Sequence, residues 1–261
     1  MNAGRIWAVF LRYFYAFWKF DTLCDLFYWP ALDIFLWGIT SVWIQQYEKG
    51  VPDLALAILT GLVFWQLIWR GNYEVTINLL LEFWNRNLVN LFSTPLRLSE
   101  WVVSVMLVGI AKILIHVAFA AAVVYFAYAL NIFDVGLWPF IGFCVSLMMS
   151  GWYIGFISAA VIVYYGQRLQ MLAWMTAYMF APFSAVYYPV TALPQWAQKI
   201  AYCLPMTYIF EGMREILYHQ HFSLSLLLMS IVLNLVYIAL SLLFFVFMYE
   251  KSRAKGLARL E

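Results

Sequence analysis

The chain has 261 residues, of which 66% are hydrophobic, 20% aromatic and only 11% charged. A typical soluble domain is about 45–50% apolar and about 25% charged, so this composition excludes a soluble enzyme and a disordered regulator. The net charge of +2 is too small for a surface that follows nucleic-acid phosphates, and the sequence therefore predicts an integral membrane protein.

Long stretches without charge indicate that this protein is all-α. Residues 135–167, 169–198 and 218–249 contain no Asp, Glu, Lys or Arg. Each stretch is long enough for a membrane helix, which needs about 20 mostly apolar residues. The alternating pattern of a membrane β-barrel is absent. We expect six transmembrane helices, over residues 26–45, 54–73, 101–130, 138–164, 169–188 and 223–249.

The basic residues predict the orientation. Six spans place both termini on one side, and most of the 15 Lys and Arg residues, Arg70 among them, then fall on that side. Lys49, Lys199 and Arg214 fall on the other side. Because Lys and Arg are enriched in cytoplasmic loops, we expect both termini in the cytoplasm.

Residues 1–20 precede the first span and carry a basic stripe. Arg5, Arg12 and Lys19 recur every seven residues, and apolar side chains cover the rest of the helix. This pattern predicts an amphipathic helix that lies in the cytoplasmic interface of the membrane. The alternative is a simple extension of the first span.

Residues 75–100 form the longest expected cytoplasmic connection. A helix is expected over 77–92, with Glu82 and Arg86 at i,i+4 spacing. Pro95 ends this helix, and Ser99 with Glu100 is expected to cap the next span. Exposed Trp and Leu side chains beside these charges suit docking onto a soluble partner, whereas the alternative is a helix that rests on lipid headgroups. The expected contact residues are Glu82, Trp84, Arg86, Leu88 and Leu91.

Residues 188–220 are too rich in proline for one straight span and too apolar for a solvated loop. Short helices that dip partway into the outer leaflet fit this composition best. Broken backbone is tolerated at membrane depth only where protein or a water-filled cavity covers it, so this segment is a candidate for the outer mouth of a pathway. Its candidate residues are Pro189, Pro194, Trp196, Pro205, Tyr208, Glu211 and Arg214.

Three ionisable side chains lie well inside predicted spans, whereas Arg70 is expected at the cytoplasmic end of the second. Asp33 lies in the first span, and Lys112 and His116 lie one turn apart in the third. A charge inside the bilayer is costly and indicates a functional group or a paired one. Asp33 and Lys112 could form a pair, Lys112 could face a pathway, or each could have another partner. In the fourth span, Gly151 and Gly155 form a G-x-x-x-G that permits close helix packing.

Catalytic motifs are absent from the sequence. It has no phosphate-binding G-x-x-x-x-G-K-[ST] loop and no H-E-x-x-H pair. His219 and His221 have no third ligand nearby, so we expect no metal site. Cys24, Cys144 and Cys203 lie in apolar contexts and are expected to be buried thiols. We expect no catalytic residues, and no cofactor bound by this chain.

Taken in order, these features resemble the membrane subunit of an ABC-2 type exporter. The segment from Leu88 to Leu96 is similar to the L-x-x-L-x-x-[ST]-P-L segment of that family. The stretches that begin at Pro189 and Pro205 are similar to its P-x-x-x-L-P-x-W and P-x-T-Y-x-x-E-x-x-R motifs. The Phe27-Tyr28-Trp29-Pro30 opening of the first span also fits.

The resemblance implies a permease in the bacterial cytoplasmic (inner) membrane that pairs with a second copy of itself and with a separate ABC ATPase. ATP and Mg would bind that partner. Residues 75–100 would be the coupling segment, and residues 188–220 would be re-entrant exit helices. The expected function is export of an amphipathic or lipid-linked substrate, such as a polysaccharide, lipid or drug. The alternative is an ion-coupled secondary transporter that uses Asp33, Lys112 and His116. No nucleic-acid partner is expected.

Overall fold

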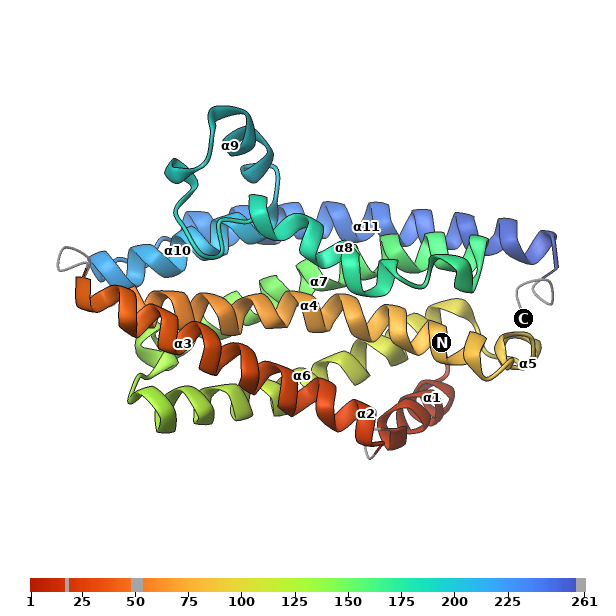
Figure 1. Cartoon of the computed structure of the whole chain (residues 1–261). Coiled ribbons are helices and arrows are strands. Elements are labelled where there is room, and N and C mark those ends of the chain that lie inside the picture. The colour runs from red at the N-terminus through yellow and green to blue at the C-terminus, as the bar shows by residue number, and fades with distance from the viewer. Residues whose placement is uncertain (17–18, 48–53, 257–261) are drawn as a thin grey trace.

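The computed structural model describes residues 1–16, 19–47 and 54–256, and these residues form helices and no strand. The long helices run along one another as a bundle (Figure 1). The helices are α1 (Ala3–Tyr15), α2 (Phe20–Leu23), α3 (Trp29–Tyr47), α4 (Leu54–Trp84), α5 (Leu88–Ser93), α6 (Leu98–Tyr128), α7 (Leu137–Tyr165), α8 (Leu172–Phe180), α9 (Gln195–Ala201), α10 (Pro205–His219) and α11 (Leu224–Ala254). Short turns are a π-helical turn, η2 (Cys24–Tyr28), and the 3-10 turns η3 (Ile132–Val135), η4 (Gln167–Leu169), η5 (Ala181–Phe183) and η6 (Val190–Ala192).

Within the described residues, five helices are long and apolar enough to cross a membrane, which makes this a multi-pass membrane protein. They agree with five of the expected spans. The five segments are Cys24–Gln45, Leu54–Trp84, Leu98–Tyr128, Leu137–Tyr165 and Leu224–Ala254.

The continuous helix expected over 169–188 is wrong. The structure has η4, then α8 of nine residues, then η5. At 1.5 Å per residue, α8 spans only about 14 Å, which is too short to cross a bilayer alone. Pro182 lies in η5, and Ala185 has a left-handed φ of 57°, so regular helix cannot continue through this region.

Helix α4 lies at the centre of the bundle and is longer than the sequence predicts. It packs against α3, α6, α7 and α8 and is buried along most of its length. The expected span ended at residue 73, but the helix continues to Trp84. Arg70 therefore lies inside a membrane helix with 1% of its surface exposed, and its assignment to the cytoplasmic side was wrong.

The single helix expected over 77–92 is also wrong. Arg86 has a φ of 50°, and the Asn87 amide donates to the Glu82 carbonyl across this left-handed residue at 2.8 Å. This turn ends α4 and separates it from α5. As expected, α5 ends just before Pro95, but α6 begins with Arg97 as its N-cap, whose amide donates to the carboxylate of Glu100.

Close contact between α4 and α7 depends on glycine. A Cβ atom at Gly151 would lie 2.5 Å from the Ile68 carbonyl oxygen and 2.8 Å from the Gly71 Cα. At Gly155 it would lie 2.9 Å from the Val75 side chain. The G-x-x-x-G of α7 thus lets the two backbones touch.

The bundle has two distinct ends. Helices α1 and α5 and the end of α11 gather at one end, whereas α9 stands out from the side of the bundle nearer the other end (Figure 1). Both termini of the described chain therefore lie at the end that carries α5.

Candidate functional site

Helix α4 carries a polar side chain at every fourth position. All five of these side chains are buried, with between 1% and 7% of their surface exposed. Residues four apart are neighbours on a helix surface, offset by about 40°, so these groups form a stripe that winds gradually around α4. The stripe consists of Gln66, Arg70, Glu74, Asn78 and Glu82.

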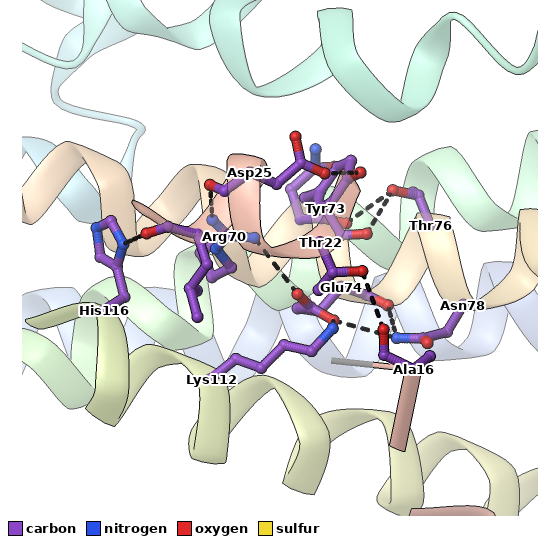
Figure 2. A network of polar contacts seen from close by, with 12 residues as sticks. Ala16, Thr22, Asp25, Arg70, Tyr73, Glu74, Thr76, Asn78, Lys112 and His116 are labelled. Atoms are coloured by element: carbon purple, nitrogen blue, oxygen red, sulfur yellow. Dashed lines mark hydrogen bonds and ion pairs between the residues drawn. The ribbon is translucent and has the colours of Figure 1, made fainter. Parts of the chain in front are cut away.

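Glu74 is the centre of an ionic network at the middle of this stripe. Lys112 of α6 donates from Nζ to Glu74 Oε2 at 2.7 Å, and Arg70 Nη1 lies 3.5 Å from Glu74 Oε1 (Figure 2). Asn78 donates to the Glu74 carbonyl at 2.7 Å. Breaking a buried ion pair is costly because one charge then lies unmatched in a low dielectric. Glu74 is therefore the counter-ion of both buried cations.

The π-helical turn η2 joins this network from the first span. Pro30 has no N–H, so it cannot donate to the carbonyl groups four and five residues earlier. Side chains of other helices bind these two oxygens instead. The Asp25 carbonyl accepts from Arg70 Nη2, and the Leu26 carbonyl lies 3.3 Å from Nδ1 of His116. The Phe-Tyr-Trp-Pro opening of this span thus creates two acceptors inside the bundle.

Two further contacts complete the arrangement. The Tyr73 hydroxyl donates to Asp25 Oδ2 at 2.6 Å (Figure 2). His116 Nε2 lies 2.9 Å from Gln66 Oε1. These contacts tie η2, α4 and α6 together.

Asp33 lies apart from Lys112, although the two were a possible pair. Lys112 is bound to Glu74 instead. Asp33 is half-buried, and among the described residues the structure gives its carboxylate no hydrogen bond or ion pair. It faces a cavity of about 310 Å³ between α3, α4, α6 and α8. His116 lines the same cavity. The structure therefore brings Lys112 and His116 into one network and Asp33 to the edge of it.

Some of the predicted coupling residues are buried against the bundle, and the others are exposed at the turn between α4 and α5. Leu88 is fully buried and Leu91 is 7% exposed, so the expectation that these leucines are exposed for docking is wrong. Trp84 is 43% exposed, and its indole N–H donates to Gln170 at 3.2 Å. Arg86 is exposed at the turn itself. The leucines hold α5 against the bundle, and Trp84 and Arg86 are the exposed residues of this set.

Glu82, at the buried end of α4, connects this region to α1. It accepts hydrogen bonds from Arg12 at 2.8 Å, from the Tyr13 hydroxyl at 2.9 Å and from Asn87 at 2.6 Å. Burial raises the pKa of Tyr13 above its usual value, so the phenol stays protonated and donates to the carboxylate. The Glu82–Arg86 pair expected from i,i+4 spacing is replaced by these contacts, because α4 ends before Arg86.

A second tie links α1 to the start of α6. Arg5 donates to the Pro95 carbonyl at 2.5 Å and lies 3.6 Å from Glu100. The backbone N–H of Asn2 donates to the same Glu100 carboxylate at 2.7 Å. Two of the three basic residues of the stripe, Arg5 and Arg12, thus bind carboxylates of the bundle, whereas Lys19 is exposed.

The region 188–220 contains short helices, as its prolines predict. Pro189 and Pro194 directly precede η6 and α9, and Pro205 begins α10. Trp196 is 62% exposed on α9. The Tyr208 hydroxyl donates to the Tyr202 carbonyl at 2.8 Å, which closes the turn between α9 and α10.

Glu211 and Arg214 bind the chain that precedes α9. Glu211 accepts from the Val190 amide at 2.8 Å, and Arg214 donates to it at 3.0 Å. Arg214 also donates to the carbonyl of Ala185 at 2.5 Å. The E-x-x-R part of the sequence motif thus holds residues 185–190 against α10.

Sequence reasoning missed Glu74, Asp25 and Tyr73. The spacing of polar residues by four along α4 was a usable signal for Glu74, but it is hidden when the span is taken to end at residue 73. Nothing in the sequence pairs Asp25 with Tyr73, since that contact depends on the π-helical turn.

Comparison with known proteins agrees with these features. A family model described as ABC-2 type transporter matches residues 5–218, which is more than half of the chain. No curated protein matches the sequence.

Proposed function

Because the chain belongs to the ABC-2 type transporter family and is a transport membrane subunit of that family, we propose that it exports an amphipathic or lipid-linked substrate out of the cytoplasm. The family implies pairing with an ABC ATPase subunit, which supplies ATP hydrolysis, and this chain is the permease component. As a subunit of such a transporter, it moves a substrate by changing between two conformations that nucleotide at the partner favours differently.

The observation that carries this proposal is the anchored turn between α4 and α5. Arg86 in this turn and Asn90 in the following helix α5 are exposed, whereas Glu82 at the end of α4 is buried and bound to α1. A partner that pushes on this turn therefore acts on the end of α4. The stripe of polar side chains then continues along α4 to the cavity, which provides a rigid connection between the two places.

Further parts of the proposal concern the assembly. Two copies pair in the bacterial inner membrane with both termini cytoplasmic, and the ATPase binds the end that carries α1 and α5. The chain crosses six times, with α8 and its flanking turns as the fifth crossing. Residues 188–220 form re-entrant exit helices, which is supported by the position of α9 at the side of the bundle and by its exposed Trp196 (Figure 1).

The test is reconstitution of the subunit with the ABC ATPase that co-purifies with it. Vesicles carrying the complex should move a fluorescent short-chain phospholipid probe only when ATP is present. The variant Arg86→Glu/Asn90→Asp should weaken ATPase binding about tenfold, because a few interface residues, arginine prominent among them, carry most of the binding energy, and this variant reverses the charge of one of them.

A charge reversal at the other end of the bundle is the matched control. Asp134 is exposed in η3, so Asp134→Lys should leave ATPase binding unchanged. Unchanged ATPase binding in the Arg86/Asn90 variant would overturn the placement of the interface. Movement of the probe by the subunit alone, driven by an ion gradient, would favour the ion-coupled alternative with Asp33, Lys112 and His116.

A further inference from the structure

The cavity beside the ionic network has aromatic walls. It is lined by Trp29, Trp65, Trp69, Trp174 and Tyr178, which come from α3, α4 and α8. Trp29 and Tyr178 are each more than half exposed, so neither ring is fully covered by the protein. Aromatic faces attract cations through the ring quadrupole.

The charges around this cavity do not balance. Glu74 is matched by Lys112 at 2.7 Å. The Arg70 guanidinium lies between Glu74 and the Asp25 carbonyl and stacks 5.3 Å from the Trp69 ring, with 1% of the residue exposed. Arg70 also lines the cavity, and its Nε and Nη1 atoms have no hydrogen-bond partner among the described residues. The two cations Arg70 and Lys112 together face three carboxylates, those of Glu74, Asp25 and Asp33, so one negative charge is in excess.

Asp33 is the carboxylate near this network that has no partner among the described residues. It makes no hydrogen bond or ion pair with any of them, and it lines the cavity. Asp25 adds a second carboxylate to the lining, which Tyr73 binds on one oxygen. An unmatched charge inside a membrane helix is costly unless a partner completes it.

We propose that the cavity binds a monovalent organic cation, with the ammonium group against Asp33 and its apolar substituents against the Trp and Tyr rings. An anion would meet two carboxylates and only one guanidinium, which already contacts Glu74, and a neutral polar molecule would leave Asp33 unmatched. The volume of about 310 Å³ admits a small substituted ammonium group. This inference deepens the proposed function, because it names the chemistry of the substrate end that this cavity receives.

The two sources of such a cation are a soluble amine and the headgroup of a lipid. Both present the same chemistry to Asp33. Choline is a suitable probe, and 3,3-dimethylbutan-1-ol is its uncharged counterpart of nearly identical shape.

The experiment is calorimetric titration of the full-length subunit in phosphatidylglycerol nanodiscs, with empty nanodiscs subtracted and without any ATPase. Choline should bind at least about tenfold more tightly than 3,3-dimethylbutan-1-ol, because only choline carries the charge that Asp33 matches. The test needs no transport, so its failure is distinct from failure of the proposed export function.

Two pairs of variants locate the site. Asp33→Asn should weaken choline binding at least about tenfold, whereas Asp134→Asn, which changes an exposed acid outside the cavity, should not. Trp29→Leu should weaken it, whereas Trp138→Leu, 82% exposed at the start of α7, should not. Since Asp33→Asn removes an unmatched charge, it should not lower the unfolding temperature. Measuring that temperature separates a loss of binding from misfolding.

Nanodiscs that also contain phosphatidylcholine separate the two sources. Loss of choline binding there would identify the lipid headgroup as the occupant, and unchanged binding would identify a soluble amine. Equal affinities for choline and the alcohol would overturn the proposal. So would stronger binding of methyl glucoside or methyl phosphate, wild-type affinity in Asp33→Asn, or no binding of choline at all.

Discussion

Glu74 carries more of the network than any neighbouring side chain, because two buried cations depend on it. Glu74→Gln leaves Lys112 and Arg70 without their carboxylate. We expect it to lower the free energy of unfolding by about 3–5 kcal/mol, the cost of leaving a buried charge unpaired. Denaturant unfolding of the purified subunit in detergent, followed by circular dichroism, measures this.

Glu250→Gln is the matched control for that prediction. Glu250 pairs with Arg253 at 3.5 Å, but both side chains are more than half exposed. Surface ion pairs are worth about 0–1 kcal/mol, so this change should be nearly neutral. The double variant Glu74→Gln/Lys112→Met should recover part of the loss. Equal costs for the two Glu→Gln changes would contradict the central role of Glu74.

At the scale of single elements, the glycine contact between α4 and α7 gives a sharp comparison. Gly151→Ala places a methyl group 2.5 Å from the Ile68 carbonyl oxygen, so the helices must separate. We expect a loss of about 1–3 kcal/mol, the usual cost of overpacking. In Gly109→Ala the new methyl would lie 3.6 Å from its nearest neighbour, the indole nitrogen of Trp152.

Gly109→Ala should therefore be neutral or should stabilise α6 by up to about 1 kcal/mol, since Ala is the better helix former. Unfolding temperatures of the two variants in the same detergent check both expectations. Equal stability of the two variants would show that α4 and α7 do not touch at Gly151.

The elements also show how far the sequence predicts this fold. Apolar stretches predicted five of the long helices, because the membrane requires length and apolarity and both are visible in the sequence. The end of α4 was misplaced because Arg70 and Glu74 resemble the border of a span. Only partners from α6 and η2, far away in the sequence, make these charges compatible with the interior.

The candidate site was predictable to a similar degree. Lys112 and His116 were found because charged residues are rare in apolar spans. Their partners were not found, because one sequence does not show how far two neighbouring helices are shifted along each other, and this shift decides which side chains meet. Leu88 and Leu91 were assigned to a surface because an apolar residue next to charges looks the same whether it faces a partner or its own bundle.

For the whole molecule, α1 acts as a clamp on the end that carries α5. Arg12 binds Glu82 at the end of α4, and Arg5 binds Pro95 and Glu100 at the start of α6. The variant Arg5→Met/Arg12→Met should release α1. Hydrogen bonds to charged groups are worth about 1.5–3 kcal/mol, so amide exchange of α1 should accelerate by more than about tenfold.

Hydrogen–deuterium exchange with mass spectrometry measures this, with Lys19→Met as control because Lys19 is exposed and lies outside α1. Exchange should rise in α1 and α5 together if the clamp holds both. Faster exchange confined to α1 would show that α5 is held by its leucines alone, and no change in either helix would contradict the clamp.

The ionic network also affects the order in which the protein can be made. Helix α4 is synthesised before α6, so Arg70 and Glu74 must enter the membrane before Lys112 exists. Each charge at the centre of a membrane helix costs about 2.5–3.5 kcal/mol on insertion scales. The best stretch of α4 has a mean hydropathy of only 1.5, compared with 2.6 for α11. The i,i+4 contact with Arg70 gives Glu74 a counter-ion within its own helix during this interval, and the contact with Lys112 that completes the network can form only after α6 has been synthesised.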